Sequence, residues 1–362
     1  MRRKSSGTGL KPPATPWDDI RNRSVQQGQS VRGRMPVLNV GYVGSEELAR
    51  SIAKLGDVRD IESYVYKEMI DGETRIISLL RPLKFPDSIR PLLSVLNVAK
   101  AGLVEITKVD AALGEILVSF GCAGITDGIV VINPEDGGWV DPDQVRVILS
   151  QAGLPWTVLE GTPDSHNLRE TLLKFLSVEK NSVSEALVIP IDQHFVVRGI
   201  GLVGIGYVQS GSVNKHDAIE SHPAGDFGIV RSLQVMDDDV DTAVTGDRVG
   251  LALRNLKEES LHKGCMIVHQ DSEAIESHES SRFRLIEAPF QKRGLSLDDV
   301  VHAAVGLQFN VGRVREVEED SVLIDWETPL LLRKRGTEPI LIVHLDAVPM
   351  RIMGIASEMT SV

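Results

Sequence analysis

The sequence is poor in cysteine and has no long apolar run. Its 362 residues include only two cysteines, Cys122 and Cys265, which lie too far apart for a Cys-x-x-Cys pair. Neither a disulfide framework nor a zinc ribbon is therefore encoded, and a reducing cytoplasm fits this pattern. No apolar run approaches the roughly 18 residues that a membrane-spanning helix needs. We therefore expect a cytoplasmic protein with no membrane partner.

The sequence also lacks a net positive charge. Its formal net charge is −12, which argues against a protein that coats nucleic acid by bulk attraction, although a local basic face could still hold phosphates. Segment 1–34 is the exception, because it has eight Lys and Arg, two acidic residues and no apolar period. This composition predicts a disordered basic arm that touches RNA, or a solvated tail. Because Met35 directly precedes the first expected strand, the segment could also be an upstream extension of the reading frame.

A third absence is the phosphate-binding loop of nucleotide hydrolases. In the pattern Gly-x-x-x-x-Gly-Lys-Ser/Thr, backbone N–H groups and the lysine hold phosphates and the hydroxyl holds magnesium. The pattern occurs nowhere in the sequence. Conventional P-loop chemistry is therefore not encoded.

Segment 35–181 does contain alternating strand and helix patterns. Strands are expected at 37–43, 75–80, 101–106, 128–132 and 156–159, and helices at 46–55, 88–96, 111–120, 143–152 and 168–175. Strands that alternate with helices of about ten residues predict a doubly wound parallel sheet. A polar stretch at 177–184 is expected to link this domain to the C-terminal half of the chain.

Two all-β segments, 182–272 and 280–362, complete the chain. In the first, apolar residues alternate with small or polar ones, and glycines punctuate the pattern at Gly199, Gly201, Gly204, Gly206 and Gly211. This favours short strands bent around a small barrel. The second has strand patterns at barrel spacing, at 282–288, 300–308, 312–317, 321–325 and 339–343. The expected fold is an α/β parallel-sheet domain followed by two antiparallel β-barrels.

Three motifs in the first all-β segment resemble domain two of the elongation factor Tu superfamily, especially its selenocysteine-specific, SelB-like branch. They are 192–212, 231–235, and the pair 246–253 and 263–268. The resemblance extends more weakly from 36 to 360. It implies that 35–181 is a P-loop-GTPase-like domain and that the barrels are like elongation-factor domains 2 and 3. It also implies delivery of aminoacyl-tRNA to the ribosome.

The first nucleotide motif of that family is only partly kept. The turn after the first strand retains Gly41 and Gly44 but has lost Gly-Lys-Thr, and Glu46 and Glu47 stand at the helix N-terminus. Their charge would repel a phosphate from the place where the helix dipole would otherwise attract it. Arg50 is the only cation near this turn in the sequence.

The second nucleotide motif is lost. Where the family has Asp-x-x-Gly, this sequence has Leu80 or Arg81 in place of the aspartate, and no glycine follows. The histidine that positions the attacking water in translational GTPases is replaced by Leu83 or Lys84. The resemblance therefore implies neither GTP hydrolysis nor any catalytic residue.

The base-reading motif Asn-Lys-x-Asp is replaced by Asn-Pro-Glu-Asp at 133–136. In the family the aspartate pairs with guanine and the asparagine braces the loop. Asn133 and Asp136 could therefore retain a guanine contact, and with Gly41 and Gly44 they form a vestigial nucleotide-binding set; otherwise the four-residue motif is a structural turn. The whole pattern is similar to methanogen, hence archaeal, SelB-like proteins with degenerate nucleotide domains, which are candidate factors for pyrrolysyl-tRNA.

The resemblance also implies an RNA site on the first barrel. Domain two of the family binds the aminoacylated 3′ end of tRNA, and Gly199, Gly201, Gln234 and Arg248 would border that pocket. The glycines could equally serve only to shape the barrel.

Two other groups of side chains could bind ligands. His262, Cys265, His269 and His278 are zinc-type donors, but the strand pattern favours a core cysteine and surface histidines, so no metal is expected. The basic run 333–335 lies at the tip of an expected hairpin, where it would be a phosphate contact or a solvated loop.

The sequence leaves three functions open. The first is a SelB-like elongation factor paralogue that binds aminoacyl-tRNA or another RNA, and through it the ribosome, with no cofactor and no GTP hydrolysis. The second is a functional GTP-binding elongation factor with an unconventional phosphate site, which would need GTP and magnesium. The third is a protein-interaction scaffold that keeps only the fold.

Overall fold

The computed structural model describes residues 35–134, 138–161, 163–176 and 185–362. The expected basic arm 1–34, the expected linker 177–184 and Asp136 lie outside the described residues. Contacts between Cα atoms group the described residues into one compact unit, Arg34–Val362.

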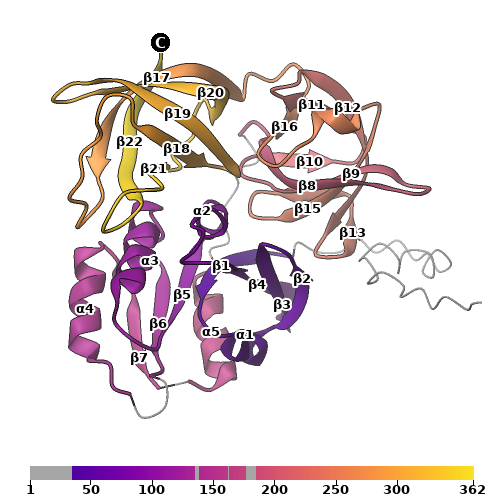
Figure 1. Ribbon diagram of the computed structural model, residues 1–362. Helices are drawn as coiled ribbons and strands as arrows, with labels where there is room; N and C mark the ends of the chain where they lie inside the picture. Colours follow the sequence, from indigo (N-terminus) through magenta and orange to yellow (C-terminus); the bar gives the residue numbers. More distant parts are fainter. Residues whose placement is uncertain (1–34, 135–137, 162, 177–184) are drawn as a thin grey trace, which may run out of the picture. The chain divides into compact units, whose positions relative to one another are not determined.

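The N-terminal domain is built on a seven-stranded sheet in the order β2-β3-β4-β1-β5-β6-β7 (Figure 1). The strands are β1 (Val37–Val43), β2 (Lys54–Val58), β3 (Ile61–Ile70), β4 (Glu73–Pro82), β5 (Ala101–Ile106), β6 (Gly128–Ile132) and β7 (Thr157–Glu160). Neighbours from β4 to β7 pair in parallel, whereas β2 and β3, and β3 and β4, pair antiparallel. The sheet is therefore mixed and not parallel throughout as predicted.

Helices cover both faces of this sheet. They are α1 (Glu46–Ile52), α2 (Arg90–Leu96), α3 (Ala111–Cys122), α4 (Pro142–Gln151) and α5 (Ser165–Lys174). Leu48 of α1 and Leu172 of α5 share one buried cluster, and the apolar faces of α2, α3 and α4 share another. The carboxylates of Asp110, Asp141 and Asp164 accept backbone N–H groups at the starts of α3, α4 and α5, which explains where these helices begin. No helix within the described ranges is long and apolar enough to cross a membrane.

The predicted first helix was too long, and the β2–β3 pair was missed. Helix α1 ends at Ile52, and the chain then forms β2 where the sequence analysis expected helix up to residue 55. Strands β3 and β4 are joined by Asp71 and Gly72, whose φ angles of 53° and 82° are both positive, as a two-residue hairpin turn requires. The Asp-Gly pair between two strand patterns was the signal that could have revealed β3.

The first barrel is closed by six strands, in the order β11-β16-β8-β9-β15-β12, with β12 pairing back to β11. Its strands are β8 (Ile189–Val197), β9 (Gly201–Tyr207), β11 (Ala218–His222), β12 (Asp226–Val235), β15 (Arg248–Arg254) and β16 (Met266–His269). Strand β13 (Asp238–Val240) extends β12, and β10 (Ser212–Asn214) pairs with β14 (Thr242–Val244). Gly199 and Gly201 have φ angles of 87° and 104° at the β8–β9 turn, a region that favours glycine.

The second barrel is closed by β17-β20-β19-β18-β21-β22. Its strands are β17 (Ile275–Glu287), β18 (Val300–Val305), β19 (Gln308–Val317), β20 (Val322–Arg333), β21 (Ile340–Val343) and β22 (Ile352–Ser361). Phe283, Val314 and Trp326 lie in its core. The predicted architecture of an α/β domain followed by two antiparallel barrels is thus confirmed.

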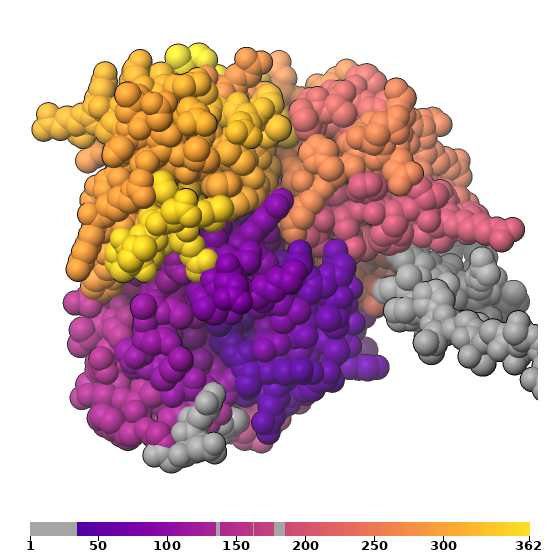
Figure 2. Space-filling model, in the orientation of Figure 1, coloured from indigo at the N-terminus to yellow at the C-terminus, as the bar shows by residue number. Residues whose placement is uncertain are grey.

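The second barrel shares a buried apolar cluster with the α/β domain. In Figure 2 the yellow part of this barrel lies against the purple surface of the α/β domain. Leu341 and Ile352 of the barrel belong to the same cluster as Leu117 of α3. Beside it, the backbone N–H and the guanidinium of Arg351 donate to the carboxylate of Glu115 in α3. Apolar burial and charge pairing therefore act together at this contact.

Candidate functional site

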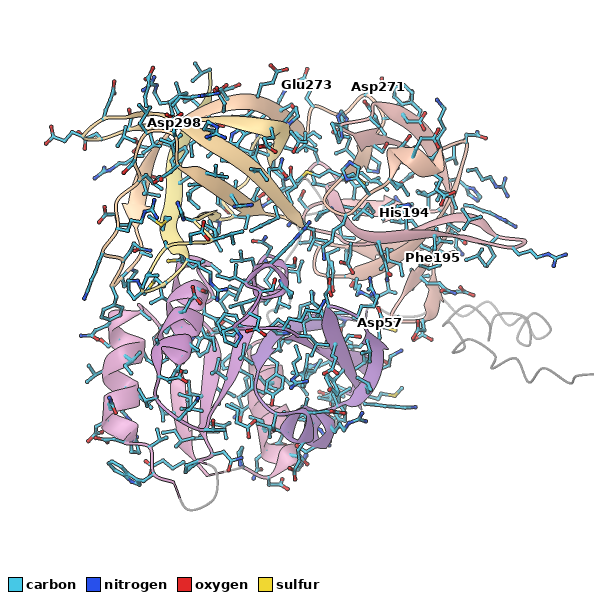
Figure 3. The ribbon with its side chains drawn as sticks, viewed as in Figure 1. Asp57, His194, Phe195, Asp271, Glu273 and Asp298 are labelled. Carbon is cyan, nitrogen blue, oxygen red and sulfur yellow. The ribbon has the colours of Figure 1, made fainter. Side chains whose placement is uncertain are left out.

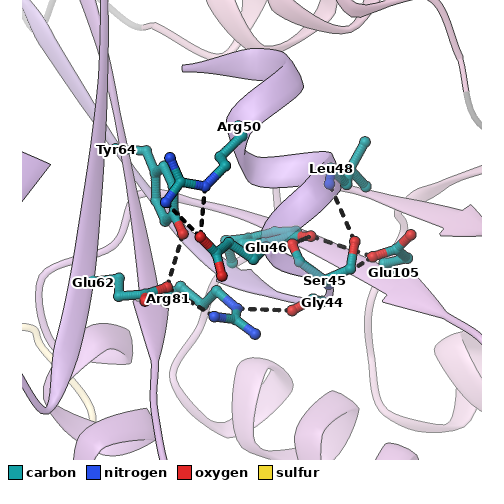
Figure 4. Close-up of polar contacts among 10 residues, drawn as sticks. Gly44, Ser45, Glu46, Leu48, Arg50, Glu62, Tyr64, Arg81 and Glu105 are labelled. Atoms are coloured by element: carbon teal, nitrogen blue, oxygen red, sulfur yellow. Dashed lines mark hydrogen bonds and ion pairs between the residues drawn. The ribbon is translucent and has the colours of Figure 1, made fainter. Parts of the chain in front are cut away.

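The turn between β1 and α1 lies where the resembled family has its phosphate-binding loop. It consists of Gly44 and Ser45. The Ser45 hydroxyl accepts the N–H of Leu48 at 3.1 Å, so Ser45 caps the helix. The backbone N–H of Ser45 donates to the carboxylate of Glu105 at 2.7 Å (Figure 4). Two donors at the start of α1 are therefore satisfied by side chains of the protein itself.

Glu105 of β5 holds this turn in place. Its other carboxylate oxygen accepts a hydrogen bond from the side-chain amide of Asn133 at 2.8 Å, and the Tyr42 hydroxyl lies 3.3 Å from the oxygen that faces Ser45. Burial alone would raise the pKa of Glu105, but the hydrogen bonds from Asn133 and Ser45 hold its pKa below its usual value. Glu105 therefore places a negative charge beside the first turn of α1 at neutral pH.

Arg81, at the end of β4, closes the turn from another side (Figure 4). Its Nε donates to the carbonyl of Gly44 at 2.8 Å, and its Nη1 donates to Glu62 at 2.7 Å. The Tyr64 hydroxyl donates to the same oxygen of Glu62 at 2.8 Å. A Cβ at Gly44 would lie 2.4 Å from the Tyr42 hydroxyl, so only glycine fits there. The turn is thus packed by side chains where a bound group would need space.

The structure brings together only part of the vestigial nucleotide set. Glu105 accepts hydrogen bonds from Asn133 and from Ser45, the neighbour of Gly44, so Gly44 and Asn133 lie near each other. Gly41 instead lies inside β1. Asp136 falls outside the part of the chain that is described. A nucleotide contact by any of these four residues stays a prediction.

Sequence reasoning missed the side chains that fill this site. Glu105, Tyr42, Glu62 and Tyr64 belong to no nucleotide motif, and their roles depend on partners far away in the sequence. One signal was present, because Glu105 is the only charged residue in the otherwise apolar strand Ala101–Ile106. A buried carboxylate in such a strand requires hydrogen-bond donors, which points to a polar site.

The four residues expected to border an RNA pocket on the first barrel do not converge. Gly199 and Gly201 lie at the turn where β9 begins, whereas Arg248 pairs with Tyr207, the last residue of β9. At about 3.3 Å per residue, the two ends of this strand are roughly 20 Å apart. Gln234 donates to a carboxylate on β13 at 2.9 Å. It pairs with β15 at a position two residues from Arg248. The structure therefore brings Gln234 and Arg248 together but holds the two glycines apart from Arg248. RNA contact by each of the four residues stays a prediction.

Arg248 belongs to a cluster of charges between the first barrel and the α/β domain. Its guanidinium lies 3.6 Å from Asp57, which is labelled in Figure 3. Arg59 reaches Asp57 at 2.7 Å and Asp192 at 3.2 Å, and Lys263 lies 3.2 Å from Asp192. Burial would raise the pKa of Asp192, but the charges of Lys263, Arg59 and Arg248 hold it below its usual value. Arg248 is therefore part of an ion-pair cluster that joins two domains.

The zinc-type donors do not gather in one place, although the backbone N–H of His262 donates to the Cys265 sulfur at 3.4 Å. Cys265 is buried, as the strand pattern predicted, but His278 is 1% exposed and is not the surface histidine that the sequence analysis expected. Its Nδ1 lies 3.2 Å from the Ser281 hydroxyl. His269 instead lies 3.1 Å from Asp217. Within the described ranges, no group of three or more His, Cys, Asp or Glu side chains could hold a metal ion.

The basic run 333–335 is partly neutralised. Arg333 pairs with Glu338 through two guanidinium nitrogens, and the Lys334 ammonium lies 3.0 Å from Glu273. These carboxylates compete with any phosphate for the two cations. A phosphate contact at this tip stays a prediction.

Comparison with known proteins agrees with this architecture. Residues 201–268 match the family elongation factor Tu domain 2. The chain is 31% identical over 290 residues to uncharacterized protein MJ0325 of Methanocaldococcus jannaschii, covering 80% of this chain and 89% of that protein. It is 27% identical over 171 residues to the selenocysteine-specific elongation factor of the same organism, covering 45% of this chain and 36% of that protein.

Solved structures show the same fold. Translation elongation factor SelB from Methanococcus maripaludis, in complex with the GTP analogue GppNHp, superposes with a TM-score of 0.73 and 19% identity, covering 91% of this chain and 81% of that one. A bacterial selenocysteine-specific elongation factor superposes with a TM-score of 0.72 and 18% identity, covering 90% of this chain and 58% of that one. At these identities the likeness concerns the fold alone.

Proposed function

We propose that this chain, which belongs to the SelB-like branch of the elongation factor Tu superfamily, binds an aminoacyl-tRNA or a related RNA without hydrolysing GTP. The family motifs in the first barrel support the RNA part of the proposal. The contacts of the turn between β1 and α1 support the absence of hydrolysis.

The observation that carries the proposal is the position of Glu105. Its carboxylate accepts the N–H of Ser45 at 2.7 Å, a donor of the kind that a phosphate would use at a helix start. Two unit charges 4 Å apart repel by about 4 kcal/mol at the effective dielectric constant near a protein surface. A phosphate at this turn would therefore have to displace Glu105 or be repelled by it.

The cations near the turn are also bound to other groups of the protein. Arg81 donates to Gly44 and Glu62, and Arg50 pairs with Glu46 at 2.5 Å. Phosphoryl transfer relies mainly on positioned cations that stabilise the charge of the transition state. A working GTPase would have to release these cations from their carboxylates, which makes it the weaker candidate function.

We predict no GTP turnover above the buffer blank when the purified full chain is incubated with GTP and magnesium. The reason is that the Glu105 carboxylate accepts the Ser45 N–H, the Ser45 hydroxyl caps α1, and the Gly-Lys-Ser/Thr pattern occurs nowhere in the sequence. Phosphate release measured over hours would check this. Turnover that disappears in the Asp136→Ala variant would contradict the prediction and favour the unconventional GTPase.

A further inference from the structure

An open groove of about 440 Å³ lies at the far end of α1 from the Gly44–Ser45 turn. Its lining includes four basic side chains, Arg50, Lys54, Lys67 and Arg169, and the aromatic ring of Tyr66. No acidic side chain lines this groove in the described part of the chain. The protein has a formal net charge of −12, so a groove whose charged side chains are all basic differs in sign from the molecule as a whole. We call it the basic groove.

Arg169 of α5 is fixed in the basic groove without a carboxylate partner. Its Nε and Nη2 donate to the carbonyls of Ile52 and Ser51, both at 2.7 Å, at the end of α1. Its guanidinium lies 4.4 Å from the centre of the Tyr66 ring. These contacts use the N–H of Nε and one N–H of Nη2 and supply no carboxylate, so they leave the positive charge uncompensated and further N–H donors available. A cation that is already held in place loses little conformational entropy when it binds an anion.

Lys54, the first residue of β2, supplies a second uncompensated charge. It is exposed and makes no ion pair with any described residue. The other two cations of the groove are paired with carboxylates outside its lining, Arg50 with Glu46 at 2.5 Å and Lys67 with Asp238 at 3.0 Å. The basic groove therefore presents two free positive charges beside an aromatic ring.

We propose that the basic groove binds the phosphate backbone of RNA, with Lys54 and Arg169 as its main phosphate contacts. The proposal rests on the proposed function, because it takes as ligand an RNA that the protein binds. A nucleic-acid strand has an anion at every nucleotide, so one strand can engage both cations together. Such backbone contacts fix the position of an RNA without reading its sequence. The groove therefore contacts the body of a tRNA and not its aminoacyl group.

The test uses the full chain and reverses one charge in the groove. We expect Lys54→Glu to weaken binding of charged and uncharged tRNA alike, by about tenfold at low salt, because a charge-assisted contact is lost. The slope of log affinity against log salt concentration should become shallower by about one, because one phosphate contact is lost together with the counterion that it releases. Lys54→Arg should bind like the unchanged protein, because it keeps the charge.

Lys108→Glu is the matched control. Lys108 has 77% of its side chain exposed, belongs to the same domain and lies outside the groove lining. The change in net charge equals that of Lys54→Glu, so long-range charge affects both variants equally. We expect Lys108→Glu to leave the salt slope unchanged. Equal losses of affinity and equal slopes in the two variants would overturn the assignment of the groove.

The results of these measurements distinguish a failure of the groove assignment from a failure of the proposed function. If the unchanged protein prefers charged tRNA and Lys54→Glu has no effect, only the groove is refuted. If the unchanged protein binds no tRNA at low salt, the proposed function fails and the groove fails with it. Binding of polyglutamate that depends on Lys54, in the absence of tRNA binding, would overturn the RNA assignment in favour of an acidic protein partner.

Discussion

Replacing Glu115 with alanine is expected to lower the free energy of unfolding by about 3–5 kcal/mol. Glu115 is 6% exposed on α3, and its carboxylate accepts the backbone N–H of Arg351 at 2.6 Å and Nη2 at 2.5 Å. Removing the carboxylate leaves the guanidinium in a partly buried position without its counter-charge. The loss should be large because an unpaired buried charge costs far more than the net contribution of the pair.

Urea unfolding followed by circular dichroism measures this effect. Glu170→Ala is the control, since Glu170 is exposed and its carboxylate lies 3.7 Å from His166; a change within about 0.5 kcal/mol is expected there. The double variant Glu115→Leu with Arg351→Met should recover most of the loss, because it removes both charges together. A loss for Glu115→Ala no larger than that of Glu170→Ala would contradict the account of this contact.

Replacing Glu105 with glutamine is expected to lower the free energy of unfolding by about 1–3 kcal/mol at neutral pH. Glutamine has one carbonyl oxygen, whereas the two oxygens of Glu105 accept from Ser45 and Asn133. The amide group of the new side chain would face one of these donors, and the charge that strengthens both hydrogen bonds would be gone. Glu47→Gln, an exposed position on α1, is the matched control and should change little.

The effect of Glu105→Gln should depend on pH. The pKa of Glu105 is lowered in the folded protein, so its charge adds stability that is fully present above the ordinary glutamate pKa of about 4.3. This stability is lost as the pH falls through the lowered pKa of the folded state. The difference between the unchanged protein and the variant should therefore shrink in acid. A difference that is the same at pH 7 and in acid would show that Glu105 is not held as a carboxylate.

Much of the fold could be predicted because the burial of a strand or helix determines which of its residues must be apolar. The runs expected at 101–106 and 128–132 are strands β5 and β6, since strands buried on both faces must be apolar. Strand β2 was missed because it is short, none of its residues is buried and its apolar residues do not alternate with polar ones. Its neighbour β3 could have been predicted from the Asp71-Gly72 pair, which forms the hairpin turn into β4.

The candidate site was less predictable than the fold. Its residues act through partners that are close only after folding, such as Ser45 with Glu105 and Arg81 with Glu62. The lost motifs indicated that phosphate chemistry was absent, but no local pattern showed what fills the turn. Arg248 was expected at an RNA pocket because of its motif, and its ion pair with Asp57 of another domain could be found only in the structure.

We expect this chain to bind charged RNA independently of nucleotide. A ligand shifts a binding equilibrium only through contacts that differ between two states. Because the Glu105 carboxylate already accepts the Ser45 N–H that a phosphate would use, we expect GTP to make no such contacts. The most direct test measures the affinity of the full chain for an aminoacyl-tRNA, pyrrolysyl-tRNA first, and for the same tRNA uncharged, each with and without GTP and magnesium. We expect the charged tRNA to bind more tightly than the uncharged one, and we expect GTP to leave both affinities unchanged. Equal affinity for both forms, or tighter binding only when GTP is present, would contradict this expectation.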